Sequence, residues 1–350
     1  MKKIAIVIAN NIERCPYILP YIQLFQENSI DFDVIYMDRD KKKNNNGFSS
    51  YPIKWLGLNK FINYSYYSFK VQRILKQQKY NMIFSFTTVS SVFLSYSLLG
   101  EYKKKYVLDI RDYTNEKNRV FYAIEKKLIK SSKLTVISSP EFKSFLPKSE
   151  YLLCHNLNEK ILKEGMTCNY SKKKQITVGY IGTIAYKEQC KKFIDLVAAD
   201  RRFNFFLYGN EQGEKTVEEY VRKTKCERIR YFGPYLPDYK LEIIKKIDIL
   251  FNAYGNGNPM LNTALSNKLY DSIFTMTPLL TSPGTAMEKE AGPLAYSIDF
   301  NMINGLDGLY EWYQNIDITD CIDYAKKYIK VIEREHLFFK KKISEVLLHD

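Results

Sequence analysis

Apolar and polar residues follow two alternating patterns along the chain. Short, nearly continuous apolar runs, typical of buried strands, alternate with segments whose apolar residues recur every three to four positions, as in helices. Continuous apolar strands separated by helices favour a parallel sheet covered on both faces. In the first half the predicted strands are 3–9, 31–37, 80–86, 105–110, 134–139 and 151–156, and the predicted helices are 16–29, 65–79 and 118–132.

The same alternation begins again after the polar stretch TCNYSKKKQ at 167–175. Here the predicted strands are 176–182, 203–209, 229–233, 248–254, 278–282 and 294–298, and the predicted helices are 187–200, 215–225, 239–247 and 263–275. The tail, 319–348, is mostly helical in pattern. Because 350 residues is about twice the usual domain size, we predict two doubly wound α/β domains, 1–166 and 167–318.

The formal charge of +14 is concentrated in the first half of the chain. Residues 1–165 hold 27 basic and 15 acidic residues, a net +12, whereas residues 166–350 hold 26 and 24, a net +2. Nucleic acid and an anionic membrane surface are both possible partners for such a basic half. A lysine-rich solvated surface explains it equally well.

Other features of the composition argue against several classes of protein. No apolar run approaches the ~18 residues of a membrane span, and the run in MKKIAIVIANN is too short for a secretory signal. The six cysteines are scattered without a CxxC pair, and the chain has only three histidines, so a structural zinc site is not expected. This cysteine usage favours a reducing cytoplasm.

Several predicted strands of the second half end in glycine. In sheets of this kind a ligand binds outside the carboxyl ends of the strands, where small residues let the backbone approach a phosphate. Ordinary turns explain each glycine singly, but their repetition favours a nucleotide-binding edge. The turns are Gly182-Thr183, followed by Lys187 in a predicted helix, then Gly209-Asn210, and Gly233 with Tyr235.

The stretch SNKLYDSIFTMTPLLTS at 266–282 combines an apolar helix pattern with three polar residues near its start. Asn267, Lys268 and Asp271 are three or four positions apart and therefore share one face. Lys268 is placed to meet a diphosphate at the helix start, and Asp271 to accept hydrogen bonds from a ribose diol. Asn267 can bond sugar hydroxyls. A simple surface pair of Lys268 and Asp271 is the alternative.

With these motifs the chain resembles a known family. The segment NKLYDSIFTMTPLLTS, preceded by IGT…YK, YGN and FGPY, looks like the donor half of family 4 retaining glycosyltransferases, above all bacterial enzymes of capsule, exopolysaccharide or O-antigen synthesis. Such enzymes have the GT-B fold, in which two Rossmann-like domains face each other across a cleft. The likeness covers residues 176 to about 300, and extends more weakly to DIRDYTNE (109–116), TVISS and CHN (154–156).

The resemblance implies a role for each candidate residue. Lys187 and Lys268 would neutralise the diphosphate, and Asp271 would bind the ribose. The donor would also meet Gly182, Thr183, Gly209, Asn210 and Asn267, with Gly233 and Tyr235 beside the base. Asp112 would face the acceptor as orienting group or base, and Asn10 and Arg111 would lie on the acceptor side. His155 is interpreted as structural.

The sequence departs from the family pattern at three places. Thr263 stands where the first of two acidic residues is usual, and Thr183 where an arginine is common. The loop ANNIERCP after the first strand lacks the usual glycines. These departures leave the identity of the donor sugar open.

The resemblance further implies sugar transfer from a nucleotide sugar, expected to be UDP-linked, to a lipid-linked polysaccharide acceptor. Anomeric configuration would be retained, and no metal or other cofactor would be required, because lysines and a helix start stabilise the leaving diphosphate. The protein would work in the cytoplasm at the inner face of the plasma membrane, held by its basic half. The terminal helix, about 319–350, would pack back on the first domain.

Three other interpretations remain at this stage. A metal-using transferase needs an Asp-x-Asp site, for which Asp31-Phe32-Asp33 and Asp38-Arg39-Asp40 are candidates. A sugar-nucleotide epimerase with the same fold needs no acceptor. A non-enzymatic polyanion binder would use the basic first half, although its aromatic residues lie mostly in core-like runs.

Overall fold

The computed structural model describes residues 2–40, 47–157 and 159–348. The chain forms two compact units, one of Met1–His155 with Glu333–Asp350 and one of Asn156–Ile332. The sequence pattern places the boundary between residues 166 and 167, whereas the units divide after His155.

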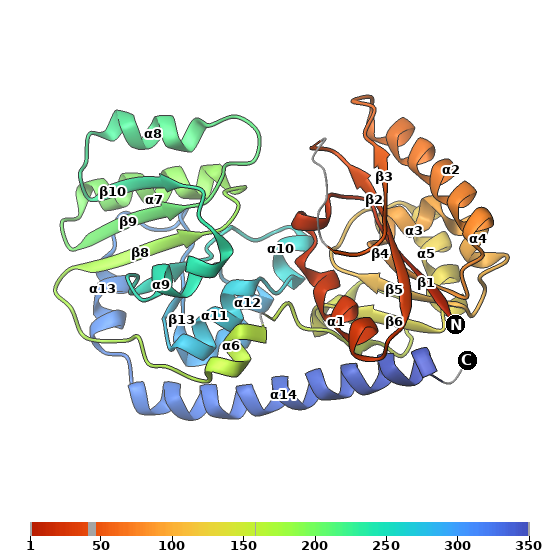
Figure 1. Cartoon of the computed structure of the whole chain (residues 1–350). Coiled ribbons are helices and arrows are strands. Elements are labelled where there is room, and N and C mark those ends of the chain that lie inside the picture. The colour runs from red at the N-terminus through yellow and green to blue at the C-terminus, as the bar shows by residue number, and fades with distance from the viewer. Residues whose placement is uncertain (1, 41–46, 158, 349–350) are drawn as a thin grey trace. The chain divides into compact units, whose positions relative to one another are not determined.

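The described part of the first unit is built on a seven-stranded parallel sheet in the order β3-β2-β1-β4-β5-β6-β7 (Figure 1). The strands are β1 (Lys3–Ile8), β2 (Asp31–Asp38), β3 (Ser50–Lys54), β4 (Met82–Phe86), β5 (Tyr106–Ile110), β6 (Leu134–Ile137) and β7 (Leu152–Leu153). The helices are α1 (Leu19–Glu27), α2 (Lys60–Gln78), α3 (Thr88–Phe93), α4 (Ser95–Leu99) and α5 (Arg119–Ser131).

Helices cover both faces of this sheet because its strands are apolar on both sides. In β1, Ile4, Ile6 and Ile8 join a core with α1, while Ala5 and Val7 join a second core with α2, α4 and α5. Side chains set the helix boundaries locally. The side-chain oxygen of Asn118 accepts the N–H groups of Val120 and Phe121 at the start of α5, as expected of an N-cap residue.

The second unit repeats this architecture on a six-stranded parallel sheet in the order β10-β9-β8-β11-β12-β13, within the part of the chain that the structure describes. The strands are β8 (Ile176–Ile181), β9 (Phe203–Tyr208), β10 (Ile229–Gly233), β11 (Ile249–Phe251), β12 (Leu279–Thr281) and β13 (Ala295–Ser297). The helices are α6 (Glu159–Glu164), α7 (Lys187–Ala199), α8 (Thr216–Thr224), α9 (Lys240–Ile244), α10 (Pro259–Thr263), α11 (Asn267–Thr275), α12 (Ala286–Ala291) and α13 (Asp307–Gln314).

Both sheets have the strand order of a Rossmann fold, in which the chain reverses direction across the sheet beside its first strand. In the second unit this switch point lies between β8 and β11, which pair directly. The prediction of two doubly wound α/β units is confirmed. The sheet edge at the end of β8 and β11 is therefore the first place to look for a ligand site.

The terminal helix α14 (Ile318–Leu348) contributes to both units. Its later residues Phe339, Ile343 and Leu347 are buried in the first unit's core. Its earlier residue Tyr328 donates a hydrogen bond of 2.8 Å to Glu290 of the second unit. Among the helices described, α14 included, none is both long and apolar enough to cross a membrane.

Candidate active site

The switch point of the second unit holds a buried lysine. Lys268 lies in the first turn of α11, and only 8% of its surface is exposed. Its Nζ donates a hydrogen bond of 2.5 Å to the hydroxyl of Tyr254, just beyond β11, and lies 4.9 Å from the ring centre of Tyr180 in β8. A Cβ atom on Gly182, at the end of β8, would come within 3.9 Å of the same nitrogen. The structure thus brings together Gly182 and Lys268, two of the residues that the sequence indicated.

The amine of Lys268 has no carboxylate within ion-pair distance among the described residues. Burial lowers its pKa to about 7, because desolvation disfavours the charged form. Lys240 lowers the pKa further, and Asp271 opposes both effects. An anion bound at this position would supply the missing negative charge and stabilise the protonated form of the buried amine.

Asp271 lies one turn further along α11 and pairs with a residue that the sequence pattern did not indicate. Its carboxylate forms an ion pair of 2.5 Å with Lys240 of α9, and only 4% of its side chain is exposed. The alternative of a surface pair between Lys268 and Asp271 is therefore wrong, since both side chains are buried and Asp271 pairs elsewhere.

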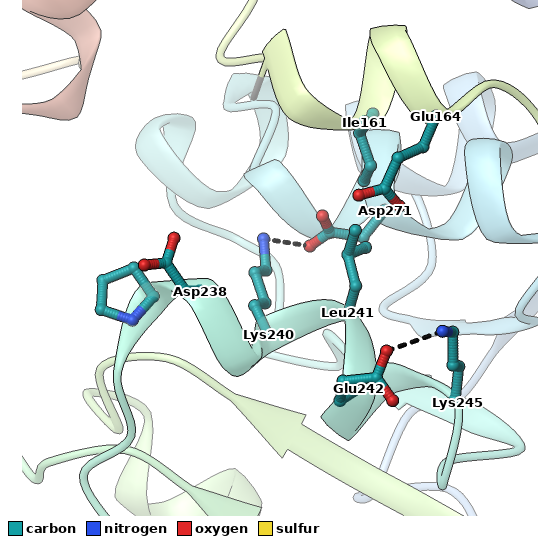
Figure 2. A pocket seen from close by; sticks show the side chains of 9 residues that line it. Ile161, Glu164, Asp238, Lys240, Leu241, Glu242, Lys245 and Asp271 are labelled. Atoms are coloured by element: carbon teal, nitrogen blue, oxygen red, sulfur yellow. Dashed lines mark hydrogen bonds and ion pairs between the residues drawn. The ribbon is translucent and has the colours of Figure 1, made fainter.

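Asp271 and Lys240 line a pocket of about 380 Å³ (Figure 2). Figure 2 shows their ion pair between α9 and α11, with Asp238, Glu164 and the apolar side chains of Ile161 and Leu241 around it. Close by, Tyr235 is half-buried, and desolvation with some help from Asp271 raises its pKa to about 12. The pocket therefore offers a carboxylate, an ammonium group and apolar surface close together.

Lys187 already has partners. At the start of α7, its Nζ lies 3.4 Å from a carboxylate oxygen of Glu211 and donates to the carbonyl oxygen of Glu214. Glu211 is fully buried and also accepts the N–H groups of Val217 and Glu218 at the start of α8. A diphosphate role for Lys187 would compete with this arrangement.

The glycine turns have reasons within the fold. A Cβ on Gly209 would lie 1.9 Å from the carbonyl oxygen of Gly182, so the two turns can pack only without a side chain at position 209. Gly233 has φ of 75° where the pairing of β10 with β9 shifts register, and its carbonyl accepts the N–H of Gly209. The repetition of glycine at the strand ends therefore reflects packing between turns as well as any approach of a ligand.

The backbone at Gly182 is also partly occupied. Its N–H donates to the carbonyl of Tyr208 at 2.8 Å, and the carbonyl of Thr183 accepts from the hydroxyl of Tyr180 at 2.9 Å. The side chains of Thr183, Asn210 and Asn267 are exposed. Of this turn, the Thr183 N–H has no hydrogen-bond partner among the described residues.

The candidates of the first unit lie at the ends of β1 and β5. Arg111 is buried with Asp109, to which its guanidinium donates, and its charge lies 5.1 Å from the ring centre of Tyr17. Asn10 is half-buried, and its side-chain oxygen accepts the N–H of Asn11 at 3.0 Å. These contacts give Arg111 a structural role in the core.

Asp112 follows Arg111 and keeps an exposed surface. Protein atoms around its carboxylate nevertheless displace water, and this desolvation raises its pKa to about 6, with Arg111 opposing and Glu116 adding to the shift. Sequence reasoning missed Glu125 of α5, a fully buried acid whose carboxylate oxygens have no hydrogen bond within the part of the chain that the structure describes. Burial raises the pKa of Glu125 to about 8, so it is largely neutral at pH 7.

The two Asp-x-Asp segments are engaged in other contacts. Asp33 accepts from Lys3 at 2.9 Å and from Tyr80 at 2.6 Å, and Asp40 pairs with Arg14 at 2.6 Å. Within residues 2–40, 47–157 and 159–348, no three His, Cys, Asp or Glu side chains are grouped so as to hold a metal ion. His155 lies 2.8 Å from Glu335 of α14, both in the first unit.

Solved structures of low sequence identity share this fold over the whole chain. Sucrose-phosphate synthase from Thermosynechococcus elongatus matches with a TM-score of 0.73, 10% identity and coverage of 100% of both chains. HepE of Anabaena, solved with UDP and glucose, matches with a TM-score of 0.67, 11% identity and 99% coverage of each. A putative UDP-N-acetylglucosamine 2-epimerase from Listeria monocytogenes matches with a TM-score of 0.60, 10% identity and coverage of 100% and 98%.

Further matches include glycosyltransferases of lipopolysaccharide synthesis. The structural neighbours of the chain are thus largely glycosyltransferases of the GT-B fold, and the prediction of that fold is confirmed. No family profile matches the sequence, and no curated protein matches it either.

Proposed function

We propose that the protein is a glycosyltransferase that binds a nucleotide-diphosphate sugar, expected to be UDP-linked, on its second unit. The observation that carries this proposal is the buried amine of Lys268 at the switch point between β8 and β11, which lacks a carboxylate partner among the described residues. A diphosphate supplies two negative charges at the place where a Rossmann-like sheet holds its ligand. Without such an anion, burial of this lysine only costs stability.

In this proposal the protein acts mainly on the leaving group. As the bond between sugar and phosphate breaks, negative charge builds up on the diphosphate, and Lys268 with the Thr183 N–H stabilises that charge. Lys187 joins them if it leaves Glu211. Because cationic side chains take this role, the reaction needs no metal ion. Retention of configuration, with the departing phosphate accepting the acceptor proton, belongs to the same proposal.

The pocket beside Asp271 would receive the nucleoside. The ribose diol donates to Asp271, which then shares its carboxylate between the sugar and Lys240. Tyr235, Gly233 and Asn267 border the same region of the donor. Asp112, with its pKa of about 6, orients the acceptor or, in place of the departing phosphate, takes its proton.

The proposed acceptor is a lipid-linked bacterial surface polysaccharide at the cytoplasmic face of the membrane. The support is the net charge of +12 on residues 1–165, which favours an anionic surface. An epimerase remains the second candidate because a putative enzyme of that class shares the fold. Release of UDP that requires an added acceptor would distinguish transfer from epimerisation.

Ligand-induced stabilisation tests the donor class. We expect UDP and UDP-sugars at 100 times their dissociation constant to add about 2.7 kcal/mol to the unfolding free energy. Uridine at the same concentration should add little, because it lacks the diphosphate. A thermal-shift panel of UDP-, GDP- and CMP-sugars measures this, followed by sugar transfer in EDTA. The proposal fails if no nucleotide sugar stabilises the protein, and its metal-independent form fails if EDTA abolishes transfer.

Binding of UDP-glucose should also depend on pH through Lys268. Its pKa is about 7 in the free protein, and the bound diphosphate raises it. Below pH 7 the amine is already protonated, so affinity is constant. Above pH 7 the complex must take up a proton, so the dissociation constant rises by up to about tenfold per pH unit. Calorimetric titrations in buffers of different ionisation enthalpy measure the uptake, and a flat profile up to pH 8.5 would contradict it.

A further inference from the structure

One stretch of the first unit combines exposed apolar side chains with an unusual charge pattern. Residues 41–100 contain nine basic residues and no acidic residue, although the remaining 290 residues carry all 39 acids of the chain. The first six residues of this stretch lie outside the described part of the structure. The rest includes β3, the loop after it, and α2 (Figure 1).

Helix α2 is apolar on two faces. The inner face places Tyr67, Val71 and Leu75 in the core against the sheet. The outer face carries Ile62 and Phe69, which are 43% and 62% exposed and stand seven positions apart, so they line one stripe of the helix. A surface helix of a globular protein needs only the inner stripe. The outer stripe is therefore left largely open to solvent.

The loop before α2 adds to this stripe. In the loop, Leu56 and Leu58 are 38% and 54% exposed; Phe61, in the first turn of α2, is 71% exposed, with its ring centre 5.6 Å from that of Phe93. The loop is held in place, because buried Asn63 accepts the N–H of Leu56 at 2.8 Å and donates to the carbonyl of Leu58 at 2.6 Å. The fold thus fixes these apolar side chains in exposed positions.

Four basic residues lie in the same stretch of chain as the apolar side chains, Lys54 at the end of β3 and the others in α2. Lys54, Lys60 and Arg73 are exposed, and Lys70 is half-buried with its Nζ 5.5 Å from the ring centre of Tyr66. A helix that carries bulky apolar groups with lysine and arginine, and no acid of its own, is typical of the interface of an anionic bilayer. A nucleic acid would match the charge but not the aliphatic side chains.

We infer that one surface of the first unit docks on anionic lipid. It consists of the apolar side chains of Leu56, Leu58, Phe61, Ile62 and Phe69 together with the basic side chains of Lys54, Lys60, Lys70 and Arg73. We call this set the α2 surface. The inference deepens the proposed function, on which it rests for the location of the acceptor. The apolar side chains enter the acyl boundary while the cations stay among the headgroups.

Vesicle flotation tests the α2 surface. The full chain should float with phosphatidylglycerol/phosphatidylcholine vesicles and about tenfold less with pure phosphatidylcholine. Phe61→Ser/Phe69→Ser should lower partitioning about tenfold, and Lys60→Glu/Arg73→Glu at least as much. The matched controls change exposed residues of the second unit, Phe232→Ser/Met302→Ser and Lys223→Glu/Lys246→Glu, and should float like the unchanged protein.

Each other outcome has a definite meaning. The inference is overturned if the unchanged protein does not float, or if the α2 variants float as well as it does. It is also overturned if the protein is a dimer that Phe61→Ser/Phe69→Ser makes monomeric. The same holds if Lys60→Glu/Arg73→Glu loses oligonucleotide binding and keeps vesicle binding. The UDP-glucose thermal shift is measured in every variant, so loss of donor binding, which concerns the proposed function, is seen separately.

Discussion

Lys268→Met is expected to lower sugar transfer by at least about a hundredfold while making the free protein more stable. Transfer falls because the leaving diphosphate loses its buried cation. Stability rises because methionine fills the space between Tyr180 and Tyr254 without a charge that burial disfavours. We expect a gain of about 1–2 kcal/mol in the unfolding free energy. Urea unfolding followed by Trp312 fluorescence in a Trp55→Phe background reports on the second unit.

The matched control is Lys187→Met, the same chemical change at a paired lysine. It leaves the buried carboxylate of Glu211 without its cation, so the unfolding free energy should fall by about 1–3 kcal/mol. Changes of opposite sign in the unfolding free energy of the two variants would distinguish a lysine that serves an anionic ligand from a lysine that stabilises the fold. Destabilisation by Lys268→Met, together with normal transfer, would contradict the site.

Asp271→Asn is expected to weaken donor binding by about 10- to 100-fold, because a hydrogen bond to a charged acceptor is lost. The loss should depend on the ribose. In the unchanged protein, UDP-glucose with 2′- or 3′-deoxyribose should bind about tenfold more weakly than the natural donor, and in Asp271→Asn the two should bind alike. Calorimetry with the four combinations measures this coupling.

Asp238→Asn is the control for that cycle. Asp238 lines the same pocket and is exposed, so its change should alter affinity less than about twofold. Additive effects of Asp271→Asn and of ribose deoxygenation would show that Asp271 does not touch the ribose. The pocket would then need another ligand.

The alternation of apolar runs and helices predicted the strands of both sheets apart from β3, because the central strands are buried on both faces. It missed β3, an edge strand in which only Ile53 is buried and Pro52 interrupts the pattern. The predicted helix at 263–275 is interrupted, because Ala264 is extended and Ser266 precedes a second helix, α11. Local backbone conformation of this kind leaves no periodic trace in the sequence.

Two rules predicted parts of the candidate site: residue spacing on one helix, and ligand binding at the carboxyl edge of a parallel sheet. Lys268 and Asp271 stand three positions apart on α11, so helix geometry places them together. The partner of Asp271, Lys240, comes from α9, and no spacing rule links the two. Likewise, the sequence pattern placed Arg111 on the acceptor side, whereas in the structure its side chain is buried in the core, where it pairs with Asp109.

In the proposed function, the second unit holds a diphosphate through Lys268 at its switch point. A crystal structure of the protein with UDP tests it directly. We expect a diphosphate oxygen within hydrogen-bond distance of Lys268 Nζ and of the Thr183 N–H, with ribose hydroxyls on Asp271. A nucleotide bound elsewhere, with Lys268 still bonded only to Tyr254, would contradict it.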